Sequence, residues 1–309
     1  MGYISHDYRK EQYIKVKTEK SATMCLYPIV SAIDKADDML GKDRIWVAIN
    51  GRQEPFIHIF ENIRGETRSM KEIKCIASMD AGEINRFLQE EGFQFMLDPF
   101  KKGEFGTASV MDILVEWLTD GHTTEITSDR DGVSIFPGVI LKTGVSFVRS
   151  SYHDQPIVVI ETKSGDKVYM MAHSRLEDMK LIARVNGIMS MPLNPISEFE
   201  GIHFPQVYID QKVDISWLER LWTRDDNGRN FEIAKILQQT KFRMNEKGAR
   251  AQSAVATKIR PTCVRITHPL LIINEPFLIW ISRPGLRQPL FTGWISEEDW
   301  KTPKNISQK

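Results

Sequence analysis

Residues 245–263 carry the most informative side-chain pattern in the sequence, and the chemistry they offer is strand pairing rather than catalysis. Every second residue from position 249 is small, β-branched or apolar, while the residues between are largely polar; the first set is Ala249, Ala251, Ser253, Val255, Thr257 and Ile259. A period of two predicts a strand with one buried and one exposed face. Gly248 is a hinge candidate before it, because glycine adopts backbone angles that other residues avoid. Pro261 ends the pattern, since proline cannot donate to a central ladder. By itself, the alternation is typical of an ordinary sheet strand.

Other residues that could do chemistry are too scattered to predict a site. The seven histidines lie far apart in the sequence, although their convergence in space is left open. Cys25, Cys75 and Cys263 form neither a paired disulfide framework nor a CxxC metal motif. The sequence also lacks the glycine-rich phosphate loops, the HExxH motif and the GxSxG motif. We therefore expect no enzyme activity, no metal site and no cofactor.

The composition is that of an ordinary globular protein and excludes several classes of partner. The 309 residues include 41 Lys and Arg and 41 Asp and Glu, so no net charge would attract nucleic acid. No run of about 18 apolar residues could span a membrane. The first residues lack the apolar core of a secretory signal. We expect a monomeric cytoplasmic protein.

The elements that would position residues 245–263 follow from periodicity and turn residues. Helices are expected over 29–40, 80–91, 108–119 and 176–186, and strands over 24–27, 44–50, 57–60, 73–76, 139–147, 156–161 and 168–172. Five more strands are expected late in the chain, over 207–209, 234–244, 270–273, 277–282 and 289–295. Early helices and late strands predict an α+β fold with large antiparallel sheets, and residues 1–309 are expected to form one domain.

Three segments in a fixed order carry a resemblance to a known family. Residues 245–248 (NEKG) are followed by residues 274–281 (NEPFLIWI) and then by residues 289–295 (PLFTGWI). Over residues 230–296 this arrangement resembles the serpins, the serine protease inhibitors, with Glu275 as one departure from their C-terminal signature. The resemblance implies a serpin-like fold with an exposed reactive loop at about 246–269. It also implies a hinge at the start of that loop, comprising Glu246, Gly248, Ala249, Ala251 and Ser253.

The family's mechanism, carried over to these positions, implies an inhibitor that is consumed by its target. A serine protease cuts the loop, and the hinge side of the loop then inserts into the central sheet. Spacing within the family places the cut between Thr262 and Cys263, and Thr262 suits an elastase-like pocket. Arg260 is a poor alternative because Pro261 follows it, and cleavage at Arg265 would lengthen the inserting segment. From residue 249 to residue 259 the face to be buried carries no charge.

Two further readings follow from the finer details of the resemblance. The spacing from the loop to the next strand looks most like that of the intracellular poxvirus serpins, which implies modulation of host proteases from the host cell cytoplasm. In contrast, the family's hydrogen-bond cluster beneath the sheet is expected at Tyr27, Thr143 and Gln238, and all three differ from the usual residues. The alternative is therefore a serpin-fold binding or interaction protein that no longer inhibits. Trp117 is expected to end a helix like one in the family.

Overall fold

The computed structural model describes residues 19–303, except for residues 69, 94–95, 112–114, 129–132, 152 and 250–267. Four α-helices and two short 3-10 helices are assigned in this part of the chain: α1 (Leu26–Leu40), α2 (Gln53–Thr67), α3 (Ala81–Glu90), α4 (Met179–Met189), η1 (Ser216–Leu218) and η2 (Glu297–Asp299). Of the helices that are described, none has the length and apolar character needed to cross a membrane.

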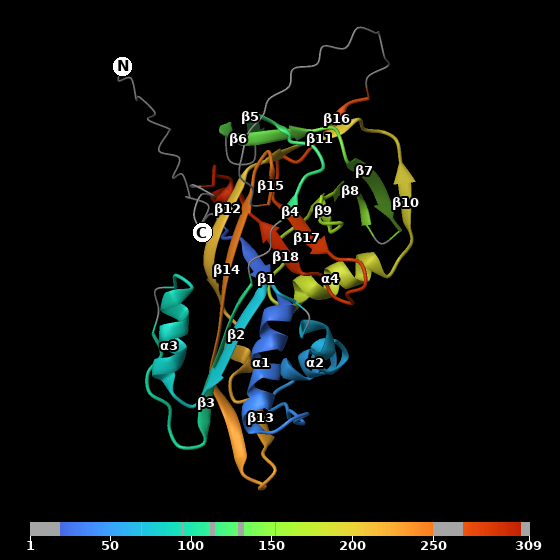
Figure 1. Ribbon diagram of the computed structural model, residues 1–309. Coiled ribbons are helices and arrows are strands. Elements are labelled where there is room, and N and C mark those ends of the chain that lie inside the picture. The colour runs from blue at the N-terminus through green and yellow to red at the C-terminus, as the bar shows by residue number, and fades with distance from the viewer. Residues whose placement is uncertain are drawn as a thin grey trace, which may run out of the picture.

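The largest sheet has seven strands and is antiparallel throughout. It is built, in spatial order, from β1 (Ala22–Met24), β18 (Phe291–Ile295), β17 (Phe277–Ser282), β9 (Lys167–Ala172), β8 (His153–Glu161), β7 (Val145–Ser150) and β10 (Leu193–Ile196). Strand β1 pairs with β18, so segments close to the two ends of the chain lie side by side (Figure 1).

A five-stranded sheet forms the other large layer. Its path is β12 (Val207–Val213), β14 (Asn230–Met244), β3 (Glu104–Met111) and β2 (Ile73–Ser78), and β13 (Trp222–Arg224) pairs with the first part of β14. The pairing of β14 with β3 is parallel, whereas β12 with β14 and β2 with β3 are antiparallel. The prediction of large antiparallel sheets therefore holds except at this one pair in the five-stranded sheet.

Two smaller sheets complete the strands. The four-stranded sheet comprises β16 (Leu270–Ile272), β11 (Gly201–Pro205), β6 (Ser134–Leu141) and β5 (His122–Ser128), with β16 parallel to β11. A two-stranded sheet pairs β15 (Gly248–Ala249) with β4 (Val115–Glu116). The single strand predicted over 139–147 is in fact β6 and β7, separated by a turn that contains Gly144 with a φ of +71°.

Helix α1 packs against one face of the five-stranded sheet, and α3 packs against the other (Figure 1). The buried side chains of α1 recur at helical spacing, as Ile29, Ile33, Ala36 and Leu40 show. The strand predicted over 24–27 is wrong except at Met24, because β1 ends at that residue and α1 begins at Leu26. Pro28 falls in the first turn of α1, where its missing N–H group costs no hydrogen bond.

Three predicted elements are wrong, over 57–60, 108–119 and 44–50, because apolar spacing in short segments does not distinguish strand, helix and loop. Residues 57–60 were expected as a strand, but they lie in α2, where Phe56, Phe60 and Ile63 are buried at helical spacing. Residues 108–119 were expected as a helix, but they contain β3 and β4. Both faces of β3 are covered, so its apolar residues do not alternate with polar ones. Residues 44–50 make only one bridge, between Val47 and Trp222.

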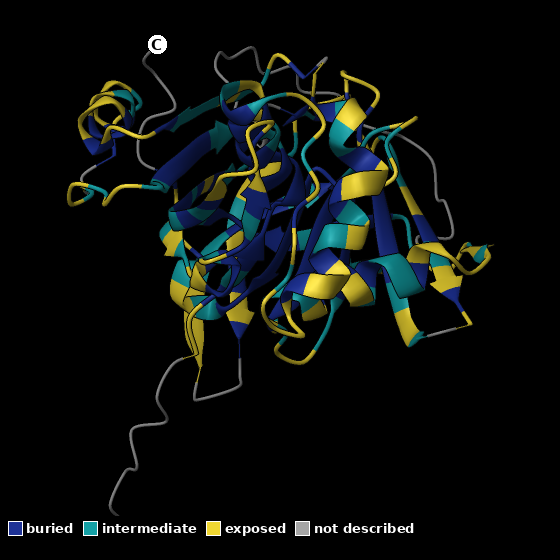
Figure 2. Cartoon of the chain, turned by 90° about the horizontal axis from the view of Figure 1, so that it is seen from below, coloured by how far each residue is buried: buried dark blue, intermediate teal, exposed yellow. Residues whose placement is uncertain are grey.

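The remaining predicted elements correspond to observed ones, although their ends shift by a few residues. One continuous apolar core extends from Met24 to Trp300 and takes in residues from both large sheets. Figure 2 shows this core as dark blue strands, with helices whose outward faces are exposed.

A cluster of ion pairs joins the two large sheets. Arg283 follows β17 and binds both carboxylate oxygens of Asp166, at 2.8 and 3.1 Å. The same guanidinium contacts Glu72 at 2.7 Å, immediately before β2. Asp166 is 1 % exposed, and Arg283 is its partner in this buried ion pair.

Candidate functional site

The parallel pairing between β3 and β14 runs through the centre of the five-stranded sheet. It extends from Glu104 opposite Glu232 to Ser109 opposite Gln238, with a bulge between Ile233 and Lys235. We call this line of pairing the seam. The two strands bond directly to each other, so a strand added here would have to separate them.

The first residues of the predicted reactive loop lie at the upper end of the seam. After β14, Asn245 bridges to Gly248 and the chain reverses direction. Strand β15 then pairs antiparallel with β4, with Gly248 opposite Glu116 and Ala249 opposite Val115. We call residues 245–249 the hinge. The hinge therefore already occupies the position between the end of β14 and the continuation of β3.

Gly248 is required at this position by both its backbone angle and its surroundings. Its φ is +148°, a region that residues with a side chain rarely adopt. A Cβ atom there would lie 2.2 Å from the carbonyl oxygen of Val115. Only glycine allows the loop to start so close to β4, which supplies the physical reason for the predicted hinge residue.

Trp117 and Gly121, which follow β4, hold the hinge turn in place through hydrogen bonds. The indole Nε1 of Trp117 donates to the carbonyl oxygen of Asn245 at 3.0 Å, and the Trp117 backbone N–H donates to Lys247 at 3.0 Å. The backbone N–H of Gly121 donates to the carbonyl oxygen of Glu246 at 2.6 Å. Trp117 is fully buried and packs edge-on against Phe204. It was expected to end a helix, but it follows the strand β4 and anchors the hinge.

The inner face of the seam, towards α1, holds a buried amide. Gln238 is 2 % exposed, and its Nε2 donates to the carbonyl oxygen of Cys25 at 2.7 Å. Ser109 lies opposite Gln238 on β3, and Cys75 lies opposite Ser109 on β2. The thiol of Cys75 contacts the Ser31 hydroxyl at 3.2 Å. This row of polar groups ties the centre of the sheet to the start of α1.

The cluster predicted from Tyr27, Thr143 and Gln238 does not exist as expected. Thr143 lies in the turn between β6 and β7, outside the five-stranded sheet. The Tyr27 hydroxyl donates to Glu66 at 2.6 Å and accepts from the Gln288 backbone N–H at 3.2 Å, so it serves α2 and the segment before β18. Only Gln238 was assigned correctly to the seam.

The thiols beside the seam, buried at Cys25 and half-buried at Cys75, are poor nucleophiles. Burial raises the pKa of Cys25 to about 12, despite a hydrogen bond with Thr240. Burial also raises the pKa of Cys75, although the Ser31 hydroxyl opposes the shift. Thiolates rather than thiols attack electrophiles, so neither residue is poised for covalent catalysis.

The outer face of the seam is covered by α3. Ile84 and Leu88 of α3, together with Phe93, form an apolar cluster with Ala108 of β3 and Leu237 of β14. The Lys241 ammonium of β14 lies 4.7 Å from the Phe93 ring centroid. Helix α3 and the residues after it therefore contact both strands of the seam.

The structure brings together three of the predicted site residues and leaves four undetermined. Glu246, Gly248 and Ala249 lie in the hinge. Four predicted positions fall outside the described residues, namely Ala251, Ser253, Thr262 and Cys263. Sequence reasoning missed Gly121 and Ser109, since neither lies in a motif.

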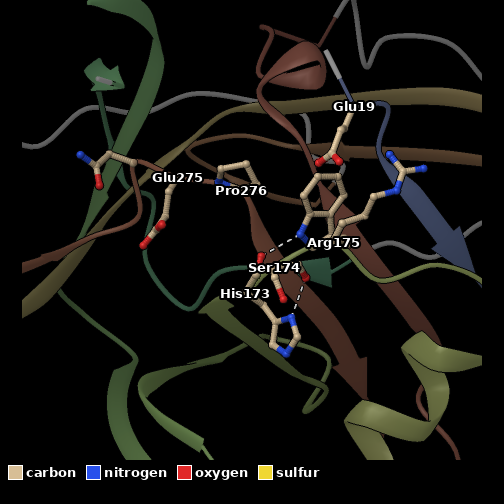
Figure 3. A pocket seen from close by; sticks show the side chains of 8 residues that line it. Glu19, His173, Ser174, Arg175, Glu275 and Pro276 are labelled. Atoms are coloured by element: carbon tan, nitrogen blue, oxygen red, sulfur yellow. Dashed lines mark hydrogen bonds between the residues drawn. The ribbon is translucent and has the colours of Figure 1, made fainter. Parts of the chain in front are cut away.

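The described residues also form one notable pocket, away from the seam. Its volume is about 740 Å³, and it is lined by Glu19, His173, Ser174, Arg175, Asn274, Glu275, Pro276 and Trp294 (Figure 3). The Trp294 indole donates to the His173 carbonyl oxygen at 2.8 Å. Among the described residues, no group of three or more potential metal ligands comes together.

Comparison with known proteins identifies the fold. No protein-family model and no curated protein matches the sequence. A serpin from Schistosoma mansoni superposes with a TM-score of 0.56 at 12% identity, covering 90% of this chain and 95% of its own. Mouse protein Z-dependent protease inhibitor gives 0.52 at 13%, covering 91% and 92%. Human thyroxine-binding globulin, solved with its hormone, gives 0.51 at 10%, covering 87% and 98%. The chain thus has the serpin fold, an α+β architecture of large, mainly antiparallel sheets with few helices.

Proposed function

We propose that this protein inhibits a serine protease by the serpin mechanism and is itself not an enzyme. The observation that carries the proposal is the pairing of β15 with β4 at the upper end of the seam. The chain leaves β14, turns back and pairs with β4, beyond the end of the seam whose two strands an inserted loop would separate. Cleavage of the loop would allow the same pairing to extend along β3.

The length of the seam fits the predicted cleavage site. Pairing that starts with Gly248 opposite Glu116 and continues without a bulge would end with Arg260 opposite Glu104, the first residue of β3. The proposed cut between Thr262 and Cys263 follows two residues later. This cut would free the whole segment that can pair, together with only the two residues that follow Arg260.

Insertion would be strongly favourable in free energy. A new central strand adds roughly ten ladder hydrogen bonds, each with a net value of about 1 kcal/mol, and it buries side chains as well. The residues that would face α1 carry no charge from position 249 to 259. Burying an unpaired charge on that face would cost several kcal/mol, and this sequence avoids that cost.

The inhibitory mechanism can be tested with proteases that accept a small residue before the cut, such as the elastases. We expect a complex that survives denaturing electrophoresis, because the acyl-enzyme would be trapped before hydrolysis. Changing Ala251 to Arg would bury a charge on the inner face and slow insertion. The acyl-enzyme would then hydrolyse, and more inhibitor would be consumed for each protease inactivated.

The matched control is Arg250→Ala, one position away on the outer face, which should leave that ratio nearly unchanged. If Ala251→Arg inhibits with the same ratio as the parent chain, the insertion mechanism is wrong for this protein. If no protease in a panel of serine proteases forms a stable complex, inhibition itself is excluded.

We propose further that the protein belongs with the intracellular poxvirus-type inhibitors and acts on a host protease as a cytoplasmic monomer. The support is the spacing between the loop and the strand at Phe277, which resembles that group. A host-cell extract passed over the immobilised chain should yield a serine protease in covalent complex. Recovery of the tagged protein from the medium of expressing cells would contradict the assignment.

A second candidate function is that of a serpin-fold binding protein without inhibitory activity. The observation that favours it is the pocket at His173, Arg175 and Trp294. Human thyroxine-binding globulin, a neighbour with this fold, was solved in complex with thyroxine. In this case thyroxine, used as a probe, should raise the melting temperature, and Arg175→Ala should abolish the shift. No stable protease complex would form.

A further inference from the structure

The outer face of the five-stranded sheet is covered only in part, and its lower end is open. Phe100, which follows α3, lies against Gly106, where an added Cβ would be 2.4 Å from the Phe100 ring. The next residue of β3 on this face, towards the lower end, is Glu104, which is half-buried. Strand β13 and residues 44–50 extend the sheet sideways at this level (Figure 1).

Four residues that lie directly opposite one another cross the sheet here. They are, from the outer edge inwards, Val47, Trp222 of β13, Glu232 of β14 and Glu104 of β3. We call these four residues the row. Neighbouring strands are about 4.8 Å apart, so the row is about 14 Å long.

The outer end of the row is apolar and exposed. Trp46 is buried, with its ring centroid 6.2 Å from that of Phe105 in the core. Successive strand residues point to opposite faces, so Val47 and Ile45 face outwards. Ile45 is 77 % exposed, Val47 37 % and Ile49, two residues further on, 44 %. Three β-branched aliphatic residues are therefore uncovered at this edge of the sheet.

These aliphatic residues form a patch rather than a scatter. Single exposed aliphatic side chains are common on protein surfaces, but Ile45, Val47 and Ile49 adjoin the half-buried Trp222. An uncovered apolar segment at a sheet edge also invites contact with another chain. The patch therefore needs a partner whose chemistry also suits the other end of the row.

The inner end of the row holds two carboxylates that lack a cation. Glu104 and Glu232 lie directly opposite each other, and both are half-buried. Within the described part of the chain, neither carboxylate takes part in an ion pair; Glu104 accepts the backbone N–H of Lys101 at 2.8 Å. Like charges opposite each other destabilise a strand pair. A cation placed over this end would remove the repulsion.

The middle of the row carries a charge of the other sign. The Arg224 guanidinium lies 5.7 Å from the Trp222 ring centroid, and its Nε donates to Asn230 at 3.0 Å. No carboxylate of the described residues forms an ion pair with Arg224. A partner that complements the whole row would therefore be cationic over the glutamates, acidic near Arg224 and apolar at the edge.

The distances along the row fit an α-helix that crosses the strands. With strands about 4.8 Å apart, Trp222 lies about 7 Å and Val47 about 12 Å from the midpoint between Glu104 and Glu232. Positions four and eight along an α-helix rise by about 6 and 12 Å, and residues four apart lie on the same face. An extended segment that crossed the strands would leave its own backbone groups unpaired, whereas a helix pairs them internally.

We propose that the row is a docking surface for an amphipathic helix of another protein. A Lys or Arg of that helix lies between Glu104 and Glu232, and an acidic residue four positions away meets Arg224. A bulky aliphatic residue a further four positions away packs against the patch at the edge. The hinge lies at the other end of the seam, so this interaction goes beyond the proposed inhibition and does not depend on it.

A synthetic helix of about 16 residues serves as the probe. It carries Lys, Glu and Leu at successive positions four apart in an alanine background, and a side-chain cross-link on its outer face keeps it helical. Added to the full chain, it should shift the methyl NMR signals of Ile45 and Ile49. The signal of Ile135, an exposed isoleucine on β6, is the control and should not move.

The apolar contact is tested by changing side chains that are exposed, so that folding is not at risk. A chain with Ile45→Ser and Ile49→Ser should bind the probe about tenfold more weakly, because the aliphatic area at the edge is lost. The matched control is Ile135→Ser, which should bind as the parent chain does. Equal binding by all three chains would overturn the docking surface.

The charge contact is tested by a double-mutant cycle. Replacing the Lys of the probe with norleucine should weaken binding to the parent chain about fivefold. This deficit should disappear in a chain with Glu104→Gln and Glu232→Gln, and it should persist in the control Glu198→Gln. The paired glutamine chain should also melt at a higher temperature without any probe, because the repulsion is gone. A deficit that persists in the paired glutamine chain would overturn the role of the two glutamates.

The remaining outcomes identify a different occupant and would also overturn the proposal. If the signals of Ile45 and Ile49 move with protein concentration alone, and sedimentation shows a doubled mass, the surface joins two copies of this chain. If phosphatidylserine vesicles move the same signals and the probe does not, the surface contacts a membrane. None of these measurements involves a protease, so their results leave the inhibitory function to its own test.

Discussion

At Gly248 the chain reverses with a backbone angle that a side chain would not tolerate, and its Cα lies against β4. Changing Gly248 to Ala should break the pairing of β15 with β4, because the new Cβ would overlap the Val115 carbonyl. We expect a loss of about 1–3 kcal/mol in the free energy of unfolding. Thermal and denaturant unfolding would measure it.

The control for this change is Gly51→Ala, where no atom lies within 4 Å of the added Cβ and φ is not positive. That variant should be neutral or slightly stabilising. Equal destabilisation of the two variants would show that the hinge contact has no special role.

The hydrogen bond from Gln238 to the chain before α1 is expected to affect both the stability of the five-stranded sheet and its opening. Its amide is the donor to the Cys25 carbonyl, so Gln238→Leu would leave a buried acceptor unpaired. We expect destabilisation of about 1–3 kcal/mol and faster annealing of a loop peptide, because the tie to α1 would be lost. Gln239→Leu, the next residue on the opposite face, is the matched control. A slower annealing rate in Gln238→Leu would contradict the assigned role.

At the scale of elements, α3 and β3 show why prediction from the sequence succeeded for one and failed for the other. Helix α3 was predicted from its apolar spacing, which is a local signal, and in the structure the Asp80 side chain caps its first turn. Strand β3 was read as a helix because α1 and α3 cover its two faces, which removes the alternation. The spacing of Val110 and Trp117 then imitated a helical stripe.

The sequence allowed the hinge to be predicted, but not the seam residues beside it. The glycine and the alternating residues after it revealed the hinge, since both are properties of contiguous sequence. Ser109, Glu104 and Glu232 carry no such signal, because they acquire meaning through the parallel pairing of segments that are far apart in the sequence. Thr143 was expected beneath the sheet beside Gln238, and this prediction was wrong for the same reason.

At the scale of the whole molecule, the ion cluster at Arg283 ties the two large sheets together. Replacing Arg283 with Met would leave the buried charge of Asp166 without its partner. We expect a loss of about 3 kcal/mol in the free energy of unfolding. Arg149→Met removes an exposed ion pair with Glu198 and should cost less than about 1 kcal/mol. Similar losses in both variants would exclude a structural role for the cluster.

The order of the strands decides what a cut in the loop would leave behind. Strands β17 and β18 follow the loop in sequence, yet β17 lies between β9 and β18 inside the seven-stranded sheet, and β18 also pairs with β1. The fragment that begins at Cys263 would therefore remain embedded in the rest of the chain. A nicked molecule would travel through a sizing column with the mass of an intact one. Cleaved chains that carry no protease would therefore match uncleaved chains in size, and denaturing electrophoresis would separate the two forms.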